Sequence, residues 1–166
     1  MKKLAAIITA GLATLAISVT AFAASLISAD EALAIAQKEV PATSTHIYTK
    51  AENLKHYHPL YEVKFYDNTT NTEYEVEVLQ TTGAIKEFSM DIKTQIGSPK
   101  IVLSANDVQA IVAKEYPDAR IYKLELDNDD GLYEYDVKFH TPALRGEMTI
   151  NPETGVIMEK DLKYKI

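Results

Sequence analysis

The sequence predicts an α+β fold built twice, as two tandem units that each pack one N-terminal helix on an antiparallel sheet of about four strands. Two observations lead to this prediction. Residues 27–41 return as residues 103–117, at an offset of 76 positions and with seven of the fifteen residues identical. Apolar and polar residues then alternate over short segments in both halves, which is typical of a sheet with one buried and one solvated face. A repeat of this kind indicates one small unit used twice.

Each unit is predicted to open with a helix. Ser28 is a favourable N-cap residue, and Glu31 three positions later completes a capping box. Ser104 and Asp107 repeat this arrangement in the second unit, and apolar residues follow at helical spacing in both. The residues that we expect to end the two helices are Pro41 and Pro117.

Strands are expected to follow each helix. The alternating segments are 61–65 and 74–78 in the first unit, and 133–139 and 147–150 in the second. An earlier strand is expected in each unit, around residues 45–50 and 119–127. Tight turns are expected at Gly83 and Gly155, because glycine readily adopts positive φ.

The N-terminal segment is predicted to be an export signal. Lys2 and Lys3 precede an uncharged, mostly apolar run over residues 4–19, and Ala21-Phe22-Ala23 fits the pattern that signal peptidase accepts. We therefore expect cleavage after Ala23 and a protein released into the periplasm or the medium. The alternative is a retained membrane anchor, because the uncharged stretch through residue 29 is long enough to span a bilayer.

The predicted organisation is a signal peptide (1–23), a first repeat (24–91), a linker (92–102) and a second repeat (103–166). Removal of the signal lowers the Lys and Arg count from 17 to 15 against 24 Asp and Glu, a net charge of −9. This acidic balance disfavours nucleic acid and anionic membranes as partners. The chain has no cysteine, so it has neither disulfides nor the lipid-bearing cysteine of a lipoprotein.

Both repeats resemble the PepSY domain. The residues that carry the resemblance are the Ser-Ala-x-x-Ala helix start, Tyr61-Glu62-Val63-Lys64-Phe65 with Thr82-Gly83-Ala84-Ile85, and Tyr135-Asp136-Val137-Lys138-Phe139 with 151–157. The first copy departs from the family pattern before its Thr-Gly, where it has Leu79-Gln80-Thr81. The resemblance implies an exported bacterial protein of a family proposed to inhibit or regulate peptidases. The layout is also similar to the tandem fold of β-lactamase inhibitory protein, at the level of fold alone.

The residue patterns predict no enzyme. There is no Gly-x-Ser-x-Gly, no His-Glu-x-x-His and no cysteine. The acidic run Asp127–Gly131 does not match the register of an EF-hand, and is expected to be a hairpin turn. Glu73, Glu75 and Glu77 share a solvated face near Lys64, as solubilising charge with cross-strand pairing.

We therefore expect no cofactor, and the leading hypothesis is a non-catalytic module that inhibits or regulates a secreted or envelope peptidase, such as a metallopeptidase, by protein–protein contact. The candidate contact residues are Tyr57, His58, Tyr66, Asp67 and Asn68. Two alternatives remain open: a scaffold protein of the envelope, and a small-ligand or metal carrier. The histidines available to such a carrier are His46, His56 and His58.

Overall fold

A computed structural model describes residues 26–52, 58–94 and 97–166, and it confirms the α+β prediction. The predicted signal segment and its cleavage point lie outside the described residues. The first unit consists of α1 (Ala29–Ala36), β1 (Thr45–Glu52), β2 (Leu60–Asp67), β3 (Thr72–Leu79) and β4 (Ile85–Ile92). The second consists of α2 (Ala105–Glu115), β5 (Arg120–Asp129), β6 (Leu132–His140), β7 (Leu144–Ile150) and β8 (Ile157–Tyr164).

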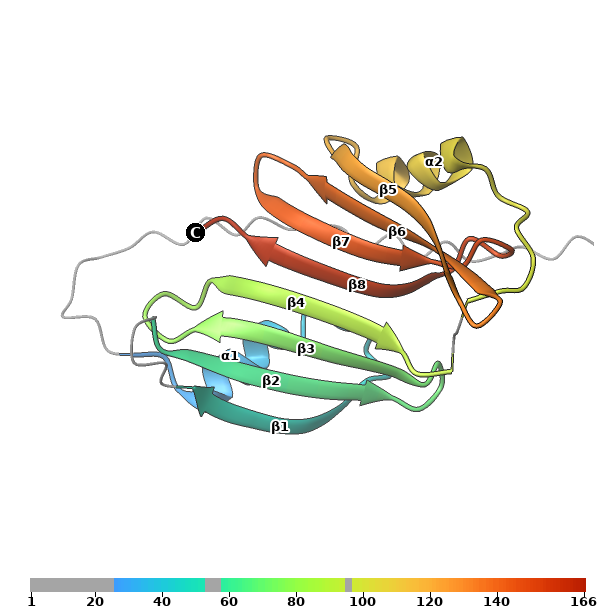
Figure 1. Cartoon of the computed structure of the whole chain (residues 1–166). Helices are drawn as coiled ribbons and strands as arrows, with labels where there is room; N and C mark the ends of the chain where they lie inside the picture. Colours follow the sequence, from blue (N-terminus) through green and yellow to red (C-terminus); the bar gives the residue numbers. More distant parts are fainter. Residues whose placement is uncertain (1–25, 53–57, 95–96) are drawn as a thin grey trace, which may run out of the picture.

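The two units share one continuous eight-stranded antiparallel sheet, in the order β1-β2-β3-β4-β8-β7-β6-β5 (Figure 1). The sequence predicts a sheet for each unit, and the structure joins the two sheets where β4 pairs with β8. In this register Phe88 lies opposite Leu162, and Ser89 lies opposite Asp161. The last strand of each repeat therefore protects an edge of the other repeat.

The helices begin where the capping residues predict. The Ser28 hydroxyl accepts a hydrogen bond from the Glu31 backbone N–H, and the Glu31 carboxylate accepts one from the Ser28 backbone N–H. The same reciprocal pair joins Ser104 and Asp107. Each capping box satisfies amide groups that would otherwise lack partners at the start of the helix.

The ends of the helices differ between the repeats. α2 continues to Glu115, next to Tyr116 and just before Pro117, as predicted. α1 ends earlier, at Ala36, and the chain reaches Pro41 through a tight turn in which the Glu39 amide donates to the Ala36 carbonyl at 3.0 Å. The prediction that Pro41 ends the first helix is therefore wrong, because a turn with short-range hydrogen bonds ends it first.

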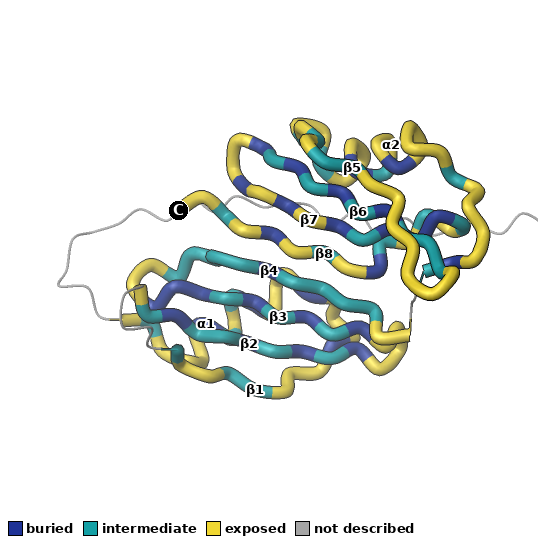
Figure 2. Tube along the Cα trace, viewed as in Figure 1, coloured by how far each residue is buried: buried dark blue, intermediate teal, exposed yellow. Residues whose placement is uncertain are grey.

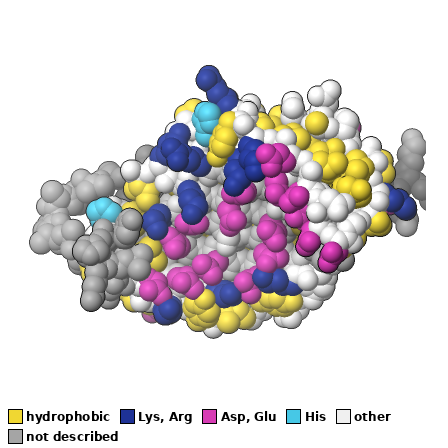
Figure 3. Space-filling view, viewed as in Figure 1, with side chains coloured by type: hydrophobic (Ala, Val, Ile, Leu, Met, Phe, Trp, Pro, Cys, Tyr) yellow, Lys and Arg dark blue, Asp and Glu magenta, His cyan; other side chains and the backbone are white. Residues whose placement is uncertain are grey.

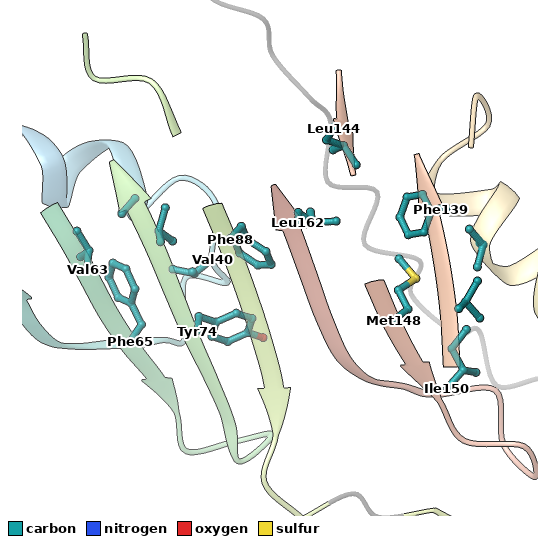
Figure 4. Close-up of a cluster of buried hydrophobic side chains, with 14 of the residues drawn as sticks. Val40, Val63, Phe65, Tyr74, Phe88, Phe139, Leu144, Met148, Ile150 and Leu162 are labelled. Atoms are coloured by element: carbon teal, nitrogen blue, oxygen red, sulfur yellow. The ribbon is translucent and has the colours of Figure 1, made fainter. Parts of the chain in front are cut away.

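The core lies between the two helices and one face of the sheet. Buried and more exposed residues alternate along the central strands (Figure 2). Phe88 and Leu162 project from β4 and β8 at the junction of the repeats, so that the apolar clusters of the two units form one core (Figure 4). The helices contribute small or branched side chains that are fully buried: Ala32, Ala36, Val108 and Val112. No helix among the described residues is long and apolar enough to cross a membrane.

The predicted glycine turns occupy equivalent places in the two repeats. Gly83 has φ +72°, and a Cβ at this position would lie 3.1 Å from Cδ1 of Ile35. Gly155 has φ +75°, and the corresponding distance to Cδ1 of Ile111 is 3.1 Å. Glycine is required at both turns by its conformation, and its lack of a side chain lets the helix pack against the turn.

Gly146 makes a different kind of contact, which leads to a test of core packing. A Cβ at this position would lie 2.2 Å from Cζ of Phe139, whose buried ring packs on Tyr116 with centroids 5.0 Å apart. We expect Gly146→Ala to lower the free energy of unfolding by about 1–3 kcal/mol, because the ring has little room to move. Urea denaturation measures this. In a Phe139→Leu background the same substitution should cost much less, and an equal cost in both backgrounds would contradict the explanation.

Candidate protein-binding surface

The sheet face opposite the helices, here called the open face, is covered by no other described element (Figures 1 and 3). Residues paired across antiparallel strands project to the same side, so the register defines three rows of side chains on this face. The middle row runs Tyr48, Lys64, Glu75, Ser89, Asp161, Glu147, Lys138, Lys123 from β1 to β5. The flanking rows contain Glu62, Glu77, Glu87 and Lys163 on one side, and Glu73, Asp91, Glu159 and Asp136 on the other.

Ion pairs neutralise many of these acids. Their Nζ–carboxylate distances are 2.9 Å for Lys64–Glu73, 2.7 Å for Lys86–Glu77, 2.6 Å for Lys138–Glu147 and 3.1 Å for Lys163–Glu87. Pairs of this kind at a surface contribute little to stability individually. These ion pairs also determine which carboxylates of the open face have no cationic partner, and Glu75, Asp161 and Glu159 are among them.

Glu75 and Asp161 are the central unpaired acids of the open face. Neither side chain forms an ion pair or a hydrogen bond with another residue in the described ranges, and the two residues flank Ser89 on neighbouring strands. Partial burial raises the pKa of Glu75, and the nearby Glu62 raises it further. Partial burial also raises the pKa of Asp161, with Glu87 adding to the effect. Both carboxylates are therefore charged at a cost that a basic group from a partner would reduce.

The structure does not gather the predicted contact residues into one site. His58 is exposed just before β2, whereas Tyr66 and Asn68 lie near the other end of this strand. Eight residues of extended strand separate the two groups by roughly 25 Å. Tyr57 lies outside the described residues. Tyr66 belongs to the open face, where its hydroxyl donates to Oδ1 of Asn71 at 3.4 Å.

Asp67 has a structural role in the β2–β3 hairpin. Its residue surface is only 2% exposed, and its carboxylate accepts hydrogen bonds from the Thr43 hydroxyl and the Thr69 amide. The bond from Thr43 lowers the pKa of Asp67, and the Thr69 amide acts in the same direction. This carboxylate is therefore engaged within the hairpin itself, and the contact role of Asp67 stays a prediction.

The histidines do not converge on a metal site within the described part of the chain. His46 pairs with Phe65 near the end of β2, and their rings lie edge to face with centroids 5.8 Å apart. His58 precedes the opposite end of β2, and His56 lies outside the described residues. No group of three His, Asp or Glu side chains in the described ranges is placed to hold a metal ion. The first three residues of the acidic run 127–131 belong to β5, and Asp130 and Gly131 form the β5–β6 hairpin turn.

The sequence pattern places Glu75 on the solvated face, but it does not identify Asp161, the second unpaired acid of the same row. The two acids are 86 positions apart in the chain, and only the β4–β8 pairing brings them to the same row. Alternation along a strand shows which face a residue occupies, but it does not show which strand lies beside it.

Both repeats match a known protein family. The family described as "Peptidase propeptide and YPEB domain", PepSY, matches residues 26–87 and 102–161. The C-terminal domain of YpeB from Bacillus megaterium has a similar fold, with 15% identity and a TM-score of 0.54 over 81% of this chain. This chain spans 62% of that chain.

A structure described as a "putative lipoprotein" from Clostridium difficile 630 also matches, with 13% identity, a TM-score of 0.34, and coverage of 80% of this chain and 90% of that chain. No curated protein matches the sequence. The similarity to YpeB at this level of identity concerns the fold alone.

The unpaired state of Glu75 can be tested by neutralising it. Folding raises the pKa of the Glu75 carboxyl, and a carboxyl with a raised pKa costs stability while it is charged. We expect Glu75→Gln to raise the free energy of unfolding at pH 7 by about 0.5–1 kcal/mol. This advantage should disappear as the pH falls through the raised pKa, because the wild-type side chain then becomes protonated. Urea denaturation across this pH range provides the measurement.

Glu73→Gln is the matched control on the same strand and face. The ion pair with Lys64 lowers the pKa of Glu73, so the charged carboxylate stabilises the fold at neutral pH. This stabilisation is lost as the pH falls through the lowered pKa and the carboxylate is protonated. The control should therefore be less stable than wild type at pH 7. The same direction of change in both variants would contradict the assignment of paired and unpaired acids.

Proposed function

The chain belongs to the PepSY family, and from this premise we propose that it is an exported, non-catalytic binding module that inhibits or regulates a secreted or envelope peptidase by protein–protein contact. Export, with cleavage after Ala23, is part of the proposal. The peptidase is proposed from the family description, which names peptidase propeptides.

The observation that carries the proposal is the pair of unpaired acids at the centre of the open face. Glu75 comes from the first repeat and Asp161 from the second, so a partner that contacts both covers the junction of the repeats. Their pKa values are raised by partial burial and by neighbouring acids. A basic surface would lower the cost of these charges, which favours association and speeds encounter.

The shape of the face supports contact over catalysis. Glu75 and Asp161 project from the middle of a broad sheet, and the two clefts described in the structure are lined by residues of the second repeat, with neither acid among them. Enzyme sites usually enclose their reacting groups in a concave pocket. Protein interfaces instead use broad surfaces in which a few central groups dominate the binding energy.

The test is titration of the purified protein into a thermolysin-like metallopeptidase from the same organism, with peptide hydrolysis and calorimetry as readouts. We expect inhibition or another change in activity by the wild type, weakening as salt is added. The double variant Glu75→Gln/Asp161→Asn should bind at least about ten-fold more weakly, because it removes both central charges. Unchanged activity together with no measurable complex would count against the peptidase as partner.

The double variant Asp30→Asn/Asp129→Asn is the matched control. It changes the net charge by the same amount, and both side chains are exposed and away from the central row. It should bind within about two-fold of wild type, because long-range charge effects are modest at physiological salt. Equal weakening by the two double variants would show that the centre of the open face is not the contact surface. Recovery of the protein in the wall-bound fraction, without a peptidase complex, would favour the scaffold alternative.

A further inference from the structure

A basic cleft lies in the second repeat, at the end of the sheet where β5 begins, β6 turns into β7 and β8 ends. Its volume is about 650 Å³, and its lining includes Asp118, Arg120, His140, Thr141, Pro142 and Lys165. An adjoining hollow shares His140 and Lys165 and adds Tyr122 and Arg145. The two arginines of the whole chain thus lie in this one region of a protein with a net charge of −7. Figure 3 shows basic side chains gathered at the upper edge of the open face.

The register of the strands brings these cations together. Arg120 of β5 lies opposite His140 of β6, and His140 lies opposite Arg145 of β7. Directly opposed residues in antiparallel strands have Cα atoms about 5 Å apart, so the two arginine backbones are separated by about 10 Å with the imidazole between them. The long guanidinium side chains can reach a single anion from both sides of His140.

The positive charges of the cleft are not neutralised by the residues around them. Neither arginine forms an ion pair or a side-chain hydrogen bond with any residue in the described ranges. Nζ of Lys165 donates to the carbonyl oxygens of Thr141 at 2.7 Å and Pro142 at 3.2 Å, and it forms no ion pair with a carboxylate of the described residues. Asp118 is the acid that lines the cleft, and its single charge does not balance the cations.

The first repeat shows that the fold does not require these residues. The row Arg120, His140, Arg145 and Lys163 in β5–β8 corresponds, strand by strand, to Thr45, Tyr66, Glu73 and Asp91 in β1–β4. Lys93 of the first repeat is equivalent to Lys165 of the second, because each lies two residues after the last member of its row, Asp91 or Lys163. Nζ of Lys93 pairs with Asp91 and lies 3.6 Å from Glu73. In the second repeat the two acids are replaced by Lys163 and Arg145; Lys163 pairs with Glu87 at 3.1 Å, whereas Arg145 has no acidic partner among the described residues.

We infer that this cleft binds a phosphoryl group. Arginine offers several N–H donors in a planar arrangement and binds oxyanions through paired hydrogen bonds. Arg120, Arg145 and Lys165 approach from three different strands or strand ends, which suits a tetrahedral anion carrying up to two negative charges better than a planar carboxylate with one. Tyr122 is 59% exposed, and its ring lies beside that of His140 with centroids 6.0 Å apart, where it forms a wall for the group that bears the phosphate. This cleft and the unpaired acids of the proposed protein contact are separate features.

The test measures binding of inorganic phosphate, glycerol 3-phosphate and dimethyl phosphate to the purified protein. Calorimetry and NMR shifts of the His140 ring protons serve as readouts, with chloride used to hold the ionic strength constant. Binding of glycerol 3-phosphate with shifts at His140 is the expected result. Stronger binding of dimethyl phosphate than of the monoester would assign the site to a phosphodiester, such as a link in a polymer, and would still support it.

Two double variants with the same change in charge separate the cleft from general electrostatics. Arg120→Gln/Arg145→Gln should weaken glycerol 3-phosphate binding at least about ten-fold, because both guanidinium groups are lost. Lys123→Gln/Lys138→Gln removes two cations of the middle row outside the cleft lining and should change binding by less than about two-fold at physiological salt. Thermal unfolding of both variants verifies that they are folded. Citrate binding tighter than all phosphates, equal loss in both variants, or no wild-type binding beyond the chloride control would overturn the inference.

Discussion

The pairing of β4 with β8 is the interaction on which the rest of the molecule depends. Each repeat alone would be a small domain with little buried surface and an unpaired strand edge open to other chains. The pairing satisfies the backbone groups of both edges. It also places Phe88 opposite Leu162, so that two small apolar clusters become one core beneath two helices. The stability of either repeat is therefore tied to the presence of the other.

The same pairing determines the character of the opposite face. Because both helices cover the same side of the sheet, no other described element covers the opposite side of the eight strands. Acids from the two repeats then meet in the middle of this face, where Glu75 and Asp161 lack the lysine partners of Glu73 and Glu147. The apolar core on the helix side of the sheet stabilises the fold enough to offset the cost of keeping these two carboxylates charged on the open face. A surface that retains such a cost is more readily explained by association than by stability.

Local patterns in the sequence predict the elements well and their assembly poorly. The two capping boxes, the alternation in β2, β3 and β6, and the glycine turns each depend on neighbouring residues, and the structure confirms them. The β4–β8 pairing depends on residues far apart in the chain, and alternation does not specify it. The contact residues predicted from one segment of the sequence therefore lie at opposite ends of β2. The two unpaired acids at the centre of the open face come from different repeats.

The two repeats also show which positions are constrained by the fold. Phe65 and Phe139 occupy equivalent core positions and are fully buried, as are Val63 and Val137. On the open face, where packing imposes little constraint, equivalent positions have changed from Glu73 and Asp91 to Arg145 and Lys163. The two repeats thus share the same interior, whereas two positions of one exposed row carry acids in the first repeat and cations in the second. The difference between the repeats, more than their similarity, is therefore the basis on which we infer an anion-binding region in the second repeat.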